Sequence, residues 1–199
     1  MSAICLEFPN KKYQVIYADP AWQYDNTNGF GEGPNGAALH YDVMSCQEIC
    51  NLPIHSISDK NCVLFLWATV PLMPEAFKVM EAWGFKYKTM LTWRKVNSLG
   101  LGFWFRGQTE HLLIGTKGEV KCFHSQKPNV IQSKVQKHSE KPRQFRALVE
   151  EVTKGIGPKI ELFARERIEG WDSWGNQLPT TMQVCLALDH AQETRRKEE

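Results

Sequence analysis

Asp19, Pro20 and Trp22 follow one another closely at the end of an apolar segment near the start of the chain. Five of the six residues at positions 13–18 are apolar or aromatic, which predicts a short buried strand. Asp19 would then lie at the carboxyl end of a strand, where open α/β sheets bind their ligands. An acid in that position, backed by a proline and an indole ring, suits chemistry on a flat ring that carries an amino group.

An exocyclic amine such as that of adenine is a poor nucleophile because its lone pair is delocalised into the ring. Acceptors for both amine hydrogens would pull the nitrogen towards tetrahedral geometry and localise that pair. Asp19 offers one acceptor, and the backbone carbonyl of Pro20 offers a second. Trp22 or Tyr24 would provide a face on which a flipped base stacks. Such a mechanism depends on fixed electrostatics more than on a strong base.

Each of these residues also has a simpler interpretation. An Asp-Pro pair after a strand is a common turn, and Trp22 and Tyr24 are also compatible with ordinary core or surface aromatics. The residues by themselves leave both interpretations open.

The segments that must position this acid alternate between two kinds of pattern. Continuous apolar runs predict strands, and apolar residues at helical spacing predict helices. The predicted strands cover residues 13–18, 61–67, 86–93, 110–115 and 159–164. Three helices are predicted: a short one that starts after Ser45, a second over residues 74–83 and a third over residues 141–153. This alternation indicates an α/β fold with a layered, mostly parallel sheet. We expect one domain over residues 1–178 and a charged, partly frayed extension over residues 179–199.

A segment rich in glycine and asparagine, residues 23–39, follows the first predicted strand. Its run from Gly31 to Gly36 matches the G-x-G-x-x-G spacing of a dinucleotide-binding fingerprint. That fingerprint must connect a strand directly to a helix, whereas this match contains Pro34 and lies about a dozen residues past the strand. We therefore predict a mobile loop over the site and place a nicotinamide oxidoreductase last among the alternatives.

The composition is typical of a globular protein that works in the cytoplasm, associated with the nucleoid if the source is bacterial. Of its 199 residues, 42% are hydrophobic and 23% are charged. The six cysteines include no Cys-x-x-Cys pair, and Cys122-x-His124 lacks the partners that a metal site needs. No run is apolar enough to span a membrane, and the N-terminus does not read as a signal peptide. We expect no metal and no membrane partner, and we make no prediction of the oligomeric state.

Cations and aromatic residues gather in two segments that could contact a nucleic acid. The first is the predicted loop 94–108, which contains Arg94, Lys95, Trp104 and Arg106. Such a mixture suits the backbone and bases of a single strand. The second, residues 117–146, holds eight lysines or arginines and two acids and could line phosphates. A solvated charged face over core aromatics gives the same pattern.

Six segments of the chain resemble, in order, the motifs of one known family. Asp19-Pro20-Ala21-Trp22 resembles an Asp-Pro-Pro-Trp box. The other five segments are residues 62–68, 110–118, 139–142, 159–165 and 174–178. The family is that of the adenine amino-methyltransferases, which includes the mRNA adenosine methyltransferase and its bacterial and phage DNA relatives. The resemblance covers about residues 13–178.

The resemblance implies S-adenosylmethionine as the methyl donor and a Rossmann-like sheet whose catalytic strand precedes the cofactor strand in sequence. It implies that the catalytic box is Asp19, Pro20, Ala21 and Trp22. The implied cofactor-binding residues are Asp19, Lys141 for the donor's carboxylate, Glu161 and Arg165 for its ribose and methionine parts, and Asn176 and Gln177 for its adenine. Without the resemblance, Lys141 is equally a solvated surface lysine, and residues 176–177 are equally a polar turn.

Two departures from the family pattern affect the prediction. Ala21 replaces the second proline of the box, so the Pro20 carbonyl survives but the loop is less stiff. Residues 166–168 also differ from the family, which leaves ribose contacts beyond Arg165 unassigned. Tyr41 resembles the tyrosine of the family's Tyr-x-x-Met and is expected either to touch the target base or to pack under the loop.

We therefore expect methylation of the exocyclic amine of adenine in DNA by an enzyme of bacterial or phage type. The base must be flipped or single-stranded, and the absence of a recognisable target-recognition domain predicts low or very short sequence specificity. The expected substrate-binding residues are Tyr24, Tyr41, Arg94, Lys95 and Arg106. Alternatives are the same reaction on RNA, a non-catalytic nucleic-acid-binding partner subunit and, less in keeping with the box, a cytosine amino-methyltransferase.

Overall fold

The backbone is organised around one sheet of mostly parallel strands. The computed structural model describes residues 8–24, 43–100, 104–136 and 140–178. The strands of this part are β1 (Tyr13–Ala18), β2 (Ser58–Thr69), β3 (Lys86–Val96), β4 (Thr109–Lys117), β5 (Val130–Lys134), β6 (Lys159–Leu162) and β7 (Asp172–Trp174). Their order across the sheet is β5-β3-β4-β2-β1-β6-β7. Only β4 is antiparallel to its neighbours, so the predicted layered, mostly parallel sheet is confirmed.

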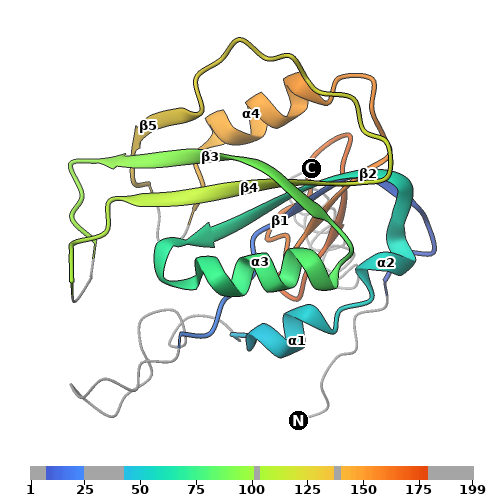
Figure 1. Cartoon of the computed structure of the whole chain (residues 1–199), viewed down its shortest axis with the longest axis horizontal. Coiled ribbons are helices and arrows are strands. Elements are labelled where there is room, and N and C mark those ends of the chain that lie inside the picture. The colour runs from blue at the N-terminus through green and yellow to red at the C-terminus, as the bar shows by residue number, and fades with distance from the viewer. Residues whose placement is uncertain (1–7, 25–42, 101–103, 137–139, 179–199) are drawn as a thin grey trace, which may run out of the picture.

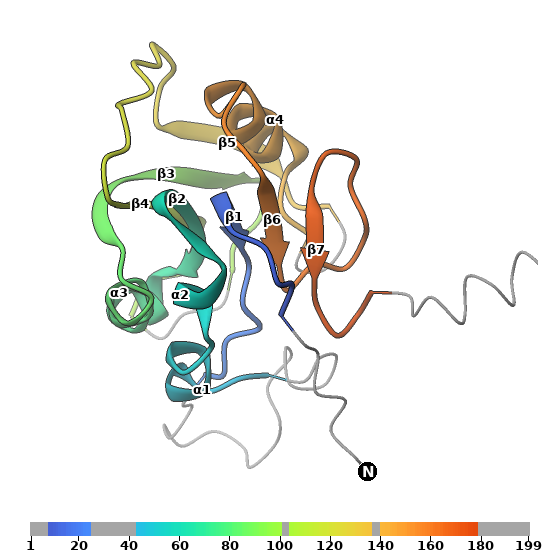
Figure 2. The same cartoon turned by 90° about the vertical axis from the view of Figure 1, so that its right-hand side faces the viewer.

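Helices cover both faces of the sheet. The described helices are α1 (Cys46–Cys50), α2 (Ile54–Ile57), the 3₁₀ turn η1 (Val70–Leu72), α3 (Met73–Ala82) and α4 (Arg143–Val152). One core packs α1, α2 and α3 against one face of the sheet, and a second core packs α4 against the other. Figures 1 and 2 show the resulting three layers, with α4 alone on its side.

The alternation of side chains along β1 explains why its sequence is apolar almost throughout. Val15 and Tyr17 pack in the core beneath α4, whereas Ile16 and Ala18 pack in the core beneath α1 to α3. A strand that is buried on both faces carries no polar side. Because β1 lies between β2 and β6, its carboxyl end is placed in the middle of the sheet edge.

Local signals place the helices well. The Ser45 side chain accepts the Glu48 N–H, and a Glu48 oxygen accepts the Ser45 N–H at 2.8 Å, so the predicted capping box is present at the start of α1. After α3, Gly84 has a φ of 81°, the left-handed conformation that ends a helix. Phe145 and Val149 are the buried residues of α4, as the predicted apolar spacing requires.

Two short strands were not predicted. β5 lies within the basic segment 117–146, and its side chains alternate between exposed and partly buried. β7 has only three residues. Both strands are too short and too polar to give a continuous apolar run, and they are held by their neighbours β3 and β6.

Several expectations concern residues that lie outside the described part of the chain. These are the glycine-rich loop from residue 25 onwards, Tyr41 and the extension at residues 179–199. Among the described residues, no helix is long and apolar enough to cross a membrane.

Candidate active site

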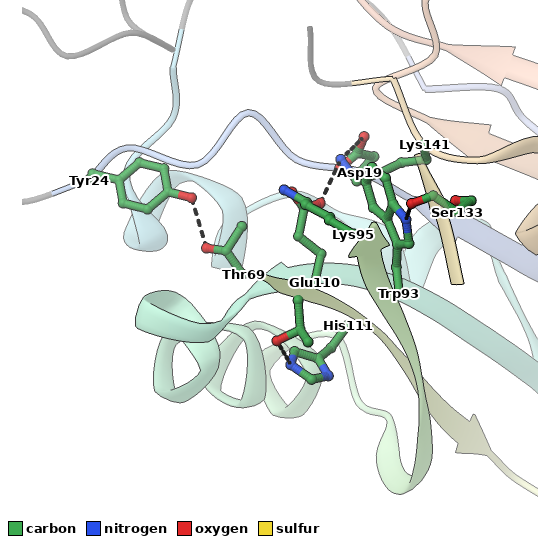
Figure 3. Close-up of polar contacts among 10 residues, drawn as sticks. Asp19, Tyr24, Thr69, Trp93, Lys95, Glu110, His111, Ser133 and Lys141 are labelled. Atoms are coloured by element: carbon green, nitrogen blue, oxygen red, sulfur yellow. Dashed lines mark hydrogen bonds and ion pairs between the residues drawn. The ribbon is translucent and has the colours of Figure 1, made fainter. Parts of the chain in front are cut away.

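Four charged side chains meet at the edge of the sheet where β1, β2 and β3 end. Asp19 follows β1, Lys141 lies two residues before the start of α4, and Lys95 lies near the end of β3. Glu110 reaches the same edge because β4 runs in the opposite direction, which sets it opposite Trp93 on β3. Figure 3 shows the four side chains converging from these separate elements.

The four charges alternate in sign along a chain of contacts. Lys141 Nζ lies 2.8 Å from Asp19 Oδ2 and 3.5 Å from Glu110 Oε2, and Lys95 Nζ lies 2.5 Å from Glu110 Oε1. Each of the four side chains is only 14–21% exposed. An unpaired charge at this depth would be strongly destabilising, so two acids and two cations form a balanced set. We call these four residues the ion network.

The network holds Lys141 and Glu110 in their charged forms. Burial disfavours the charged amine of Lys141, but Asp19 and Glu110 outweigh burial and raise the pKa of Lys141 above its ordinary value. Burial also disfavours the carboxylate of Glu110, but Lys141 and Lys95 outweigh it and lower the pKa of Glu110. Lys141 is therefore a paired, largely buried cation, and the alternative of a solvated surface lysine is ruled out.

Because its folded-state pKa is lowered, Glu110 should stabilise the fold above its unfolded pKa, and this contribution should disappear as the pH falls through the folded value. We expect Glu110→Gln to lower the free energy of unfolding at pH 7 by about 3 kcal/mol, the low end for breaking a buried ion pair. Urea unfolding of both proteins between pH 7 and pH 3 measures the difference. The exposed Glu81 on α3 provides the control, Glu81→Gln. A difference that does not shrink on acidification would contradict the assignment.

Aromatic rings line the network. Lys141 Nζ lies 5.3 Å from the ring centroid of Trp67, and Lys95 Nζ lies 5.0 Å from that of Trp93. The Trp67 indole donates a hydrogen bond of 2.6 Å to the Tyr17 hydroxyl and packs 4.8 Å from the Phe145 ring. These rings belong to the core beneath α4, so the cations rest on side chains that packing holds in place.

The Asp-Pro-Ala-Trp box forms a turn that is tied to the segment before α1. The Pro20 carbonyl accepts the Trp22 N–H at 3.0 Å, which leaves one of its two lone pairs for a substrate. The Ala21 carbonyl accepts the Met44 N–H at 2.9 Å, and the Met44 carbonyl accepts the Gln23 N–H at 3.0 Å. These bonds restrain the turn at the position where Ala21 replaces a proline.

The two aromatic candidates for base stacking differ in their surroundings. Trp22 is only 6% exposed, and its indole N–H donates to the Trp67 carbonyl at 3.1 Å, so its ring is part of the core. Tyr24 is 36% exposed, and its hydroxyl lies 2.8 Å from Thr69 Oγ1 at the end of β2. Of the two rings, Tyr24 is the one that a ligand can reach.

A second ion pair lies further along the same sheet face. Arg146 Nη2 of α4 lies 2.5 Å from Glu161 Oε1 of β6. The guanidinium is 4.5 Å from the Tyr17 ring centroid and 5.0 Å from that of Trp171. Glu161 Oε2 and Arg146 Nη1 are buried and have no hydrogen-bond partner among the described residues. Burial raises the pKa of Glu161, although Arg146 opposes the shift. Two buried, unsatisfied polar atoms that belong to one ion pair mark a place for a polar ligand.

Sequence reasoning did not identify Arg146. It was grouped with the other cations of residues 117–146, although it follows the buried Phe145 directly on an amphipathic helix. That position was the available signal, because a cation beside the apolar face of a helix either reaches solvent or finds a buried partner. Its partner, Glu161, is fifteen positions away in sequence, so the pairing depends on how α4 lies on β6.

The remaining predicted donor contacts follow β6 and β7. Arg165 comes shortly after β6 and acts as a like charge on Lys141, so it belongs to the same edge. Asn176 and Gln177 follow β7 and are exposed. Gly175 allows the backbone after β7 to lie close to the backbone after β6, because a Cβ at Gly175 would lie only 2.4 Å from the Ala164 carbonyl oxygen. The close contact brings the ends of β6 and β7 together.

Of the three cations predicted to contact a nucleic acid, one is engaged within the protein and two are exposed. Lys95 is engaged in the ion network. Arg94 is exposed and donates to Gln132 Oε1 at 3.4 Å, and Arg106 is exposed and donates to the Gly100 carbonyl at 2.6 Å. In the part of the chain that the structure describes, no cluster of three or more His, Cys, Asp or Glu residues could hold a metal ion.

Comparison with known proteins identifies the family. The model of the MT-A70 family matches residues 13–177 of this chain. The chain belongs to the MT-A70 family. It is 35% identical over 192 residues to the type II methyltransferase M.MunI of a Mycoplasma species, which covers 87% of this chain and 81% of that relative. The resemblance found in the sequence and the Rossmann-like methyltransferase fold are therefore confirmed.

Other relatives are longer proteins. The human N(6)-adenosine-methyltransferase catalytic subunit METTL3 is 29% identical over 177 residues, which are 84% of this chain and 28% of that protein. The MT-A70-like N(6)-adenosine-methyltransferase of Arabidopsis thaliana is 30% identical over 175 residues, which are 83% of this chain and 24% of that protein. The chain thus spans about a quarter of these relatives and most of the Mycoplasma one.

MT-A70 methyltransferases use S-adenosylmethionine and methylate adenine, and the polar groups of this donor suit the edge described above. An ammonium group has three N–H donors, and Lys141 donates one to Asp19 while it faces Glu110 as an ion pair, so donor capacity remains for the donor's carboxylate. The unsatisfied Glu161 Oε2 and Arg146 Nη1 match a ribose hydroxyl, which both donates and accepts. The residues of this MT-A70 chain therefore fit the donor.

Proposed function

We propose that this chain transfers a methyl group to the exocyclic amine of adenine in DNA. The observation that carries the proposal is the ion network, which holds the Asp19 carboxylate, one residue before Pro20, at the carboxyl edge of the sheet. DNA is our choice over RNA because the chain matches the Mycoplasma type II methyltransferase over 81% of that protein but only a quarter of the N(6)-adenosine-methyltransferases.

In this proposal each residue of the donor site has one role. Lys141 binds the carboxylate of S-adenosylmethionine, Glu161 and Arg165 bind its ribose and methionine parts, and Asn176 and Gln177 bind its adenine. Amide side chains suit adenine because its edge presents both a donor and an acceptor. The bound donor supplies an electrophilic methyl group.

Asp19 and Pro20 act on the target amine. Lys141 occupies Asp19 Oδ2, so we assign Oδ1 to one amine hydrogen and the free lone pair of the Pro20 carbonyl to the other. The two acceptors localise the nitrogen lone pair and aim it at the methyl group. After transfer the amine is positively charged and releases its proton easily, so Asp19 need not be a strong base. Fixed charges of this kind stabilise a transition state without reorganisation.

The target base reaches this edge from outside the stack. Tyr24 is the proposed stacking surface because its ring is reachable, and flipped bases commonly stack on aromatic side chains. Arg94 and Arg106 are proposed to hold the nucleic-acid backbone, and Tyr41 stays a proposed contact of the base. We further propose a single methyltransferase domain over residues 1–178 and low or very short sequence specificity.

The test is transfer of tritium from labelled S-adenosylmethionine to equal masses of adenine-unmethylated duplex DNA, heat-denatured DNA and RNA. Nucleoside mass spectrometry then identifies the product. We expect N6-methyldeoxyadenosine from DNA at a rate at least about tenfold above that from RNA, a difference of about 1.4 kcal/mol in the barrier. Label confined to RNA would replace our choice with the RNA reaction. Donor binding by calorimetry without transfer to any nucleic acid would instead indicate a non-catalytic subunit.

A further inference from the structure

Trp104 and Phe105 are the most exposed large hydrophobic side chains of the described residues. They are 94% and 90% exposed and lie side by side in the loop that joins β3 to β4. Figure 1 shows the described parts of this loop, on either side of residues 101–103, beyond the ends of both strands. Apolar groups placed together in solvent commonly mark an interaction site, so the pair calls for a partner that covers it.

The base of this loop is braced by hydrogen bonds. The Gly100 N–H donates to the Gly107 carbonyl at 2.9 Å, and Arg106 Nε donates to the Gly100 carbonyl at 2.6 Å. A Cβ at Gly100 would lie 2.5 Å from the Gly107 oxygen, so only glycine allows this closure. Just below, the Lys95 N–H donates to the Gln108 carbonyl at 2.8 Å. The two rings are therefore carried by a continuation of the β3–β4 pair.

A hollow lies between the loop and the ion network. Its volume is about 530 Å³, and its walls include Arg94, Lys95, Gln108 and Gln132. Lys95 links the hollow to the ion network, because it contacts Glu110. Glu110 and Asp19 both contact Lys141. Arg106 is exposed and follows the two rings directly in the chain, and Arg94 is exposed in the wall of the hollow. Cations near aromatic rings favour a nucleic acid over an apolar protein surface.

Building on the proposed function, we propose that Trp104 and Phe105 form a wedge that enters duplex DNA and fills the space left by the flipped adenine. A paired base leaves the stack only at a cost in free energy, and apolar side chains inserted between base steps unstack and kink a duplex. Rings that occupy the gap would offset that cost, while the hollow holds the backbone of the displaced strand. A single strand has no such gap, so the wedge assists methylation of duplex DNA alone.

The test compares the variant Trp104→Ala/Phe105→Ala with the wild type on two forms of one oligonucleotide that the enzyme methylates. One form is the duplex, and the other is the separated target strand. Single-turnover transfer by the variant should fall about 10- to 100-fold on the duplex, the size expected for lost base stacking, and less than about threefold on the single strand. Tyr87→Ala, which removes an exposed aromatic side chain at the start of β3 and thus at the opposite edge of the sheet, should leave both rates unchanged.

Two further measurements isolate base flipping. A duplex with a mismatch at the target adenine is easier to open, so the mismatch should restore most of the variant's rate. 2-Aminopurine at the target position becomes fluorescent when it leaves the stack. With S-adenosylhomocysteine present, the wild type should raise this fluorescence in the duplex and the variant should raise it much less. This binding signal requires no methyl transfer.

The possible failures can be told apart. Equal losses on both forms, or no loss on either, would overturn the wedge while leaving methyl transfer by the wild type intact. A dimer in sedimentation that the double variant converts to a monomer would show that the rings cover a second copy of the chain, which also overturns it. A wild type that is inactive on every nucleic acid would refute the proposed function. The 2-aminopurine signal would then decide the wedge by itself.

Discussion

Replacing Asp19 with alanine will lower single-turnover methyl transfer by about 10³-fold, the effect of removing a group aimed at charge that develops in the transition state. The affinity for the donor should change by less than about tenfold, which corresponds to about 1.4 kcal/mol of binding free energy. The reason is the arrangement of the ion network. Lys141 keeps Glu110 at 3.5 Å when Asp19 is removed, so the cation proposed to bind the donor remains in place.

Asp19→Asn separates charge from geometry. The amide retains one carbonyl acceptor but loses the negative charge, so we expect activity between those of the alanine variant and the wild type. Asp59→Ala is the matched control, because Asp59 lies at the start of β2 and thus at the opposite edge of the sheet. Labelled donor measures transfer, and calorimetry with S-adenosylhomocysteine measures binding. Turnover by Asp19→Ala close to that of the wild type would refute the proposed chemistry.

Removing the amine of Lys141 should act mainly on the donor. We expect Lys141→Ala to weaken S-adenosylhomocysteine binding by about 30-fold or more, the low end for truncating one partner of a buried charge pair. The same change leaves Asp19 and Glu110 facing each other without the cation they share. The melting temperature should therefore also fall, because uncompensated buried charges are destabilising.

The control for this prediction is two residues away. Arg143 is an exposed cation in the first turn of α4, so Arg143→Ala removes the same charge at nearly the same distance from the helix N-terminus. It should leave donor binding and melting temperature unchanged. Lys141→Met, which keeps the length of the side chain, should bind the donor as weakly as Lys141→Ala. Equal weakening by Arg143→Ala would mean that general electrostatics, and not the position of Lys141, attracts the donor.

Some of this site follows from short stretches of sequence. The apolar run at residues 13–18 is local information, and it correctly predicts a strand that ends just before Asp19. Ser45 and Glu48 likewise predict their helix start, because a capping box needs only four residues. By contrast, β5 was missed because a strand held by one neighbour at the sheet edge needs little apolar character of its own.

The sequence by itself determined the family, the layered α/β fold and the position of an acid at the end of β1, because periodicity and motifs lie within single segments. The tertiary structure alone decided which side chains meet. It joined Lys141 to Asp19 across 122 positions, turned Arg146 inward to Glu161, and buried Trp22 while exposing Tyr24. These outcomes depend on strand order and on which elements pack over each face, and no local pattern of residues encodes that arrangement.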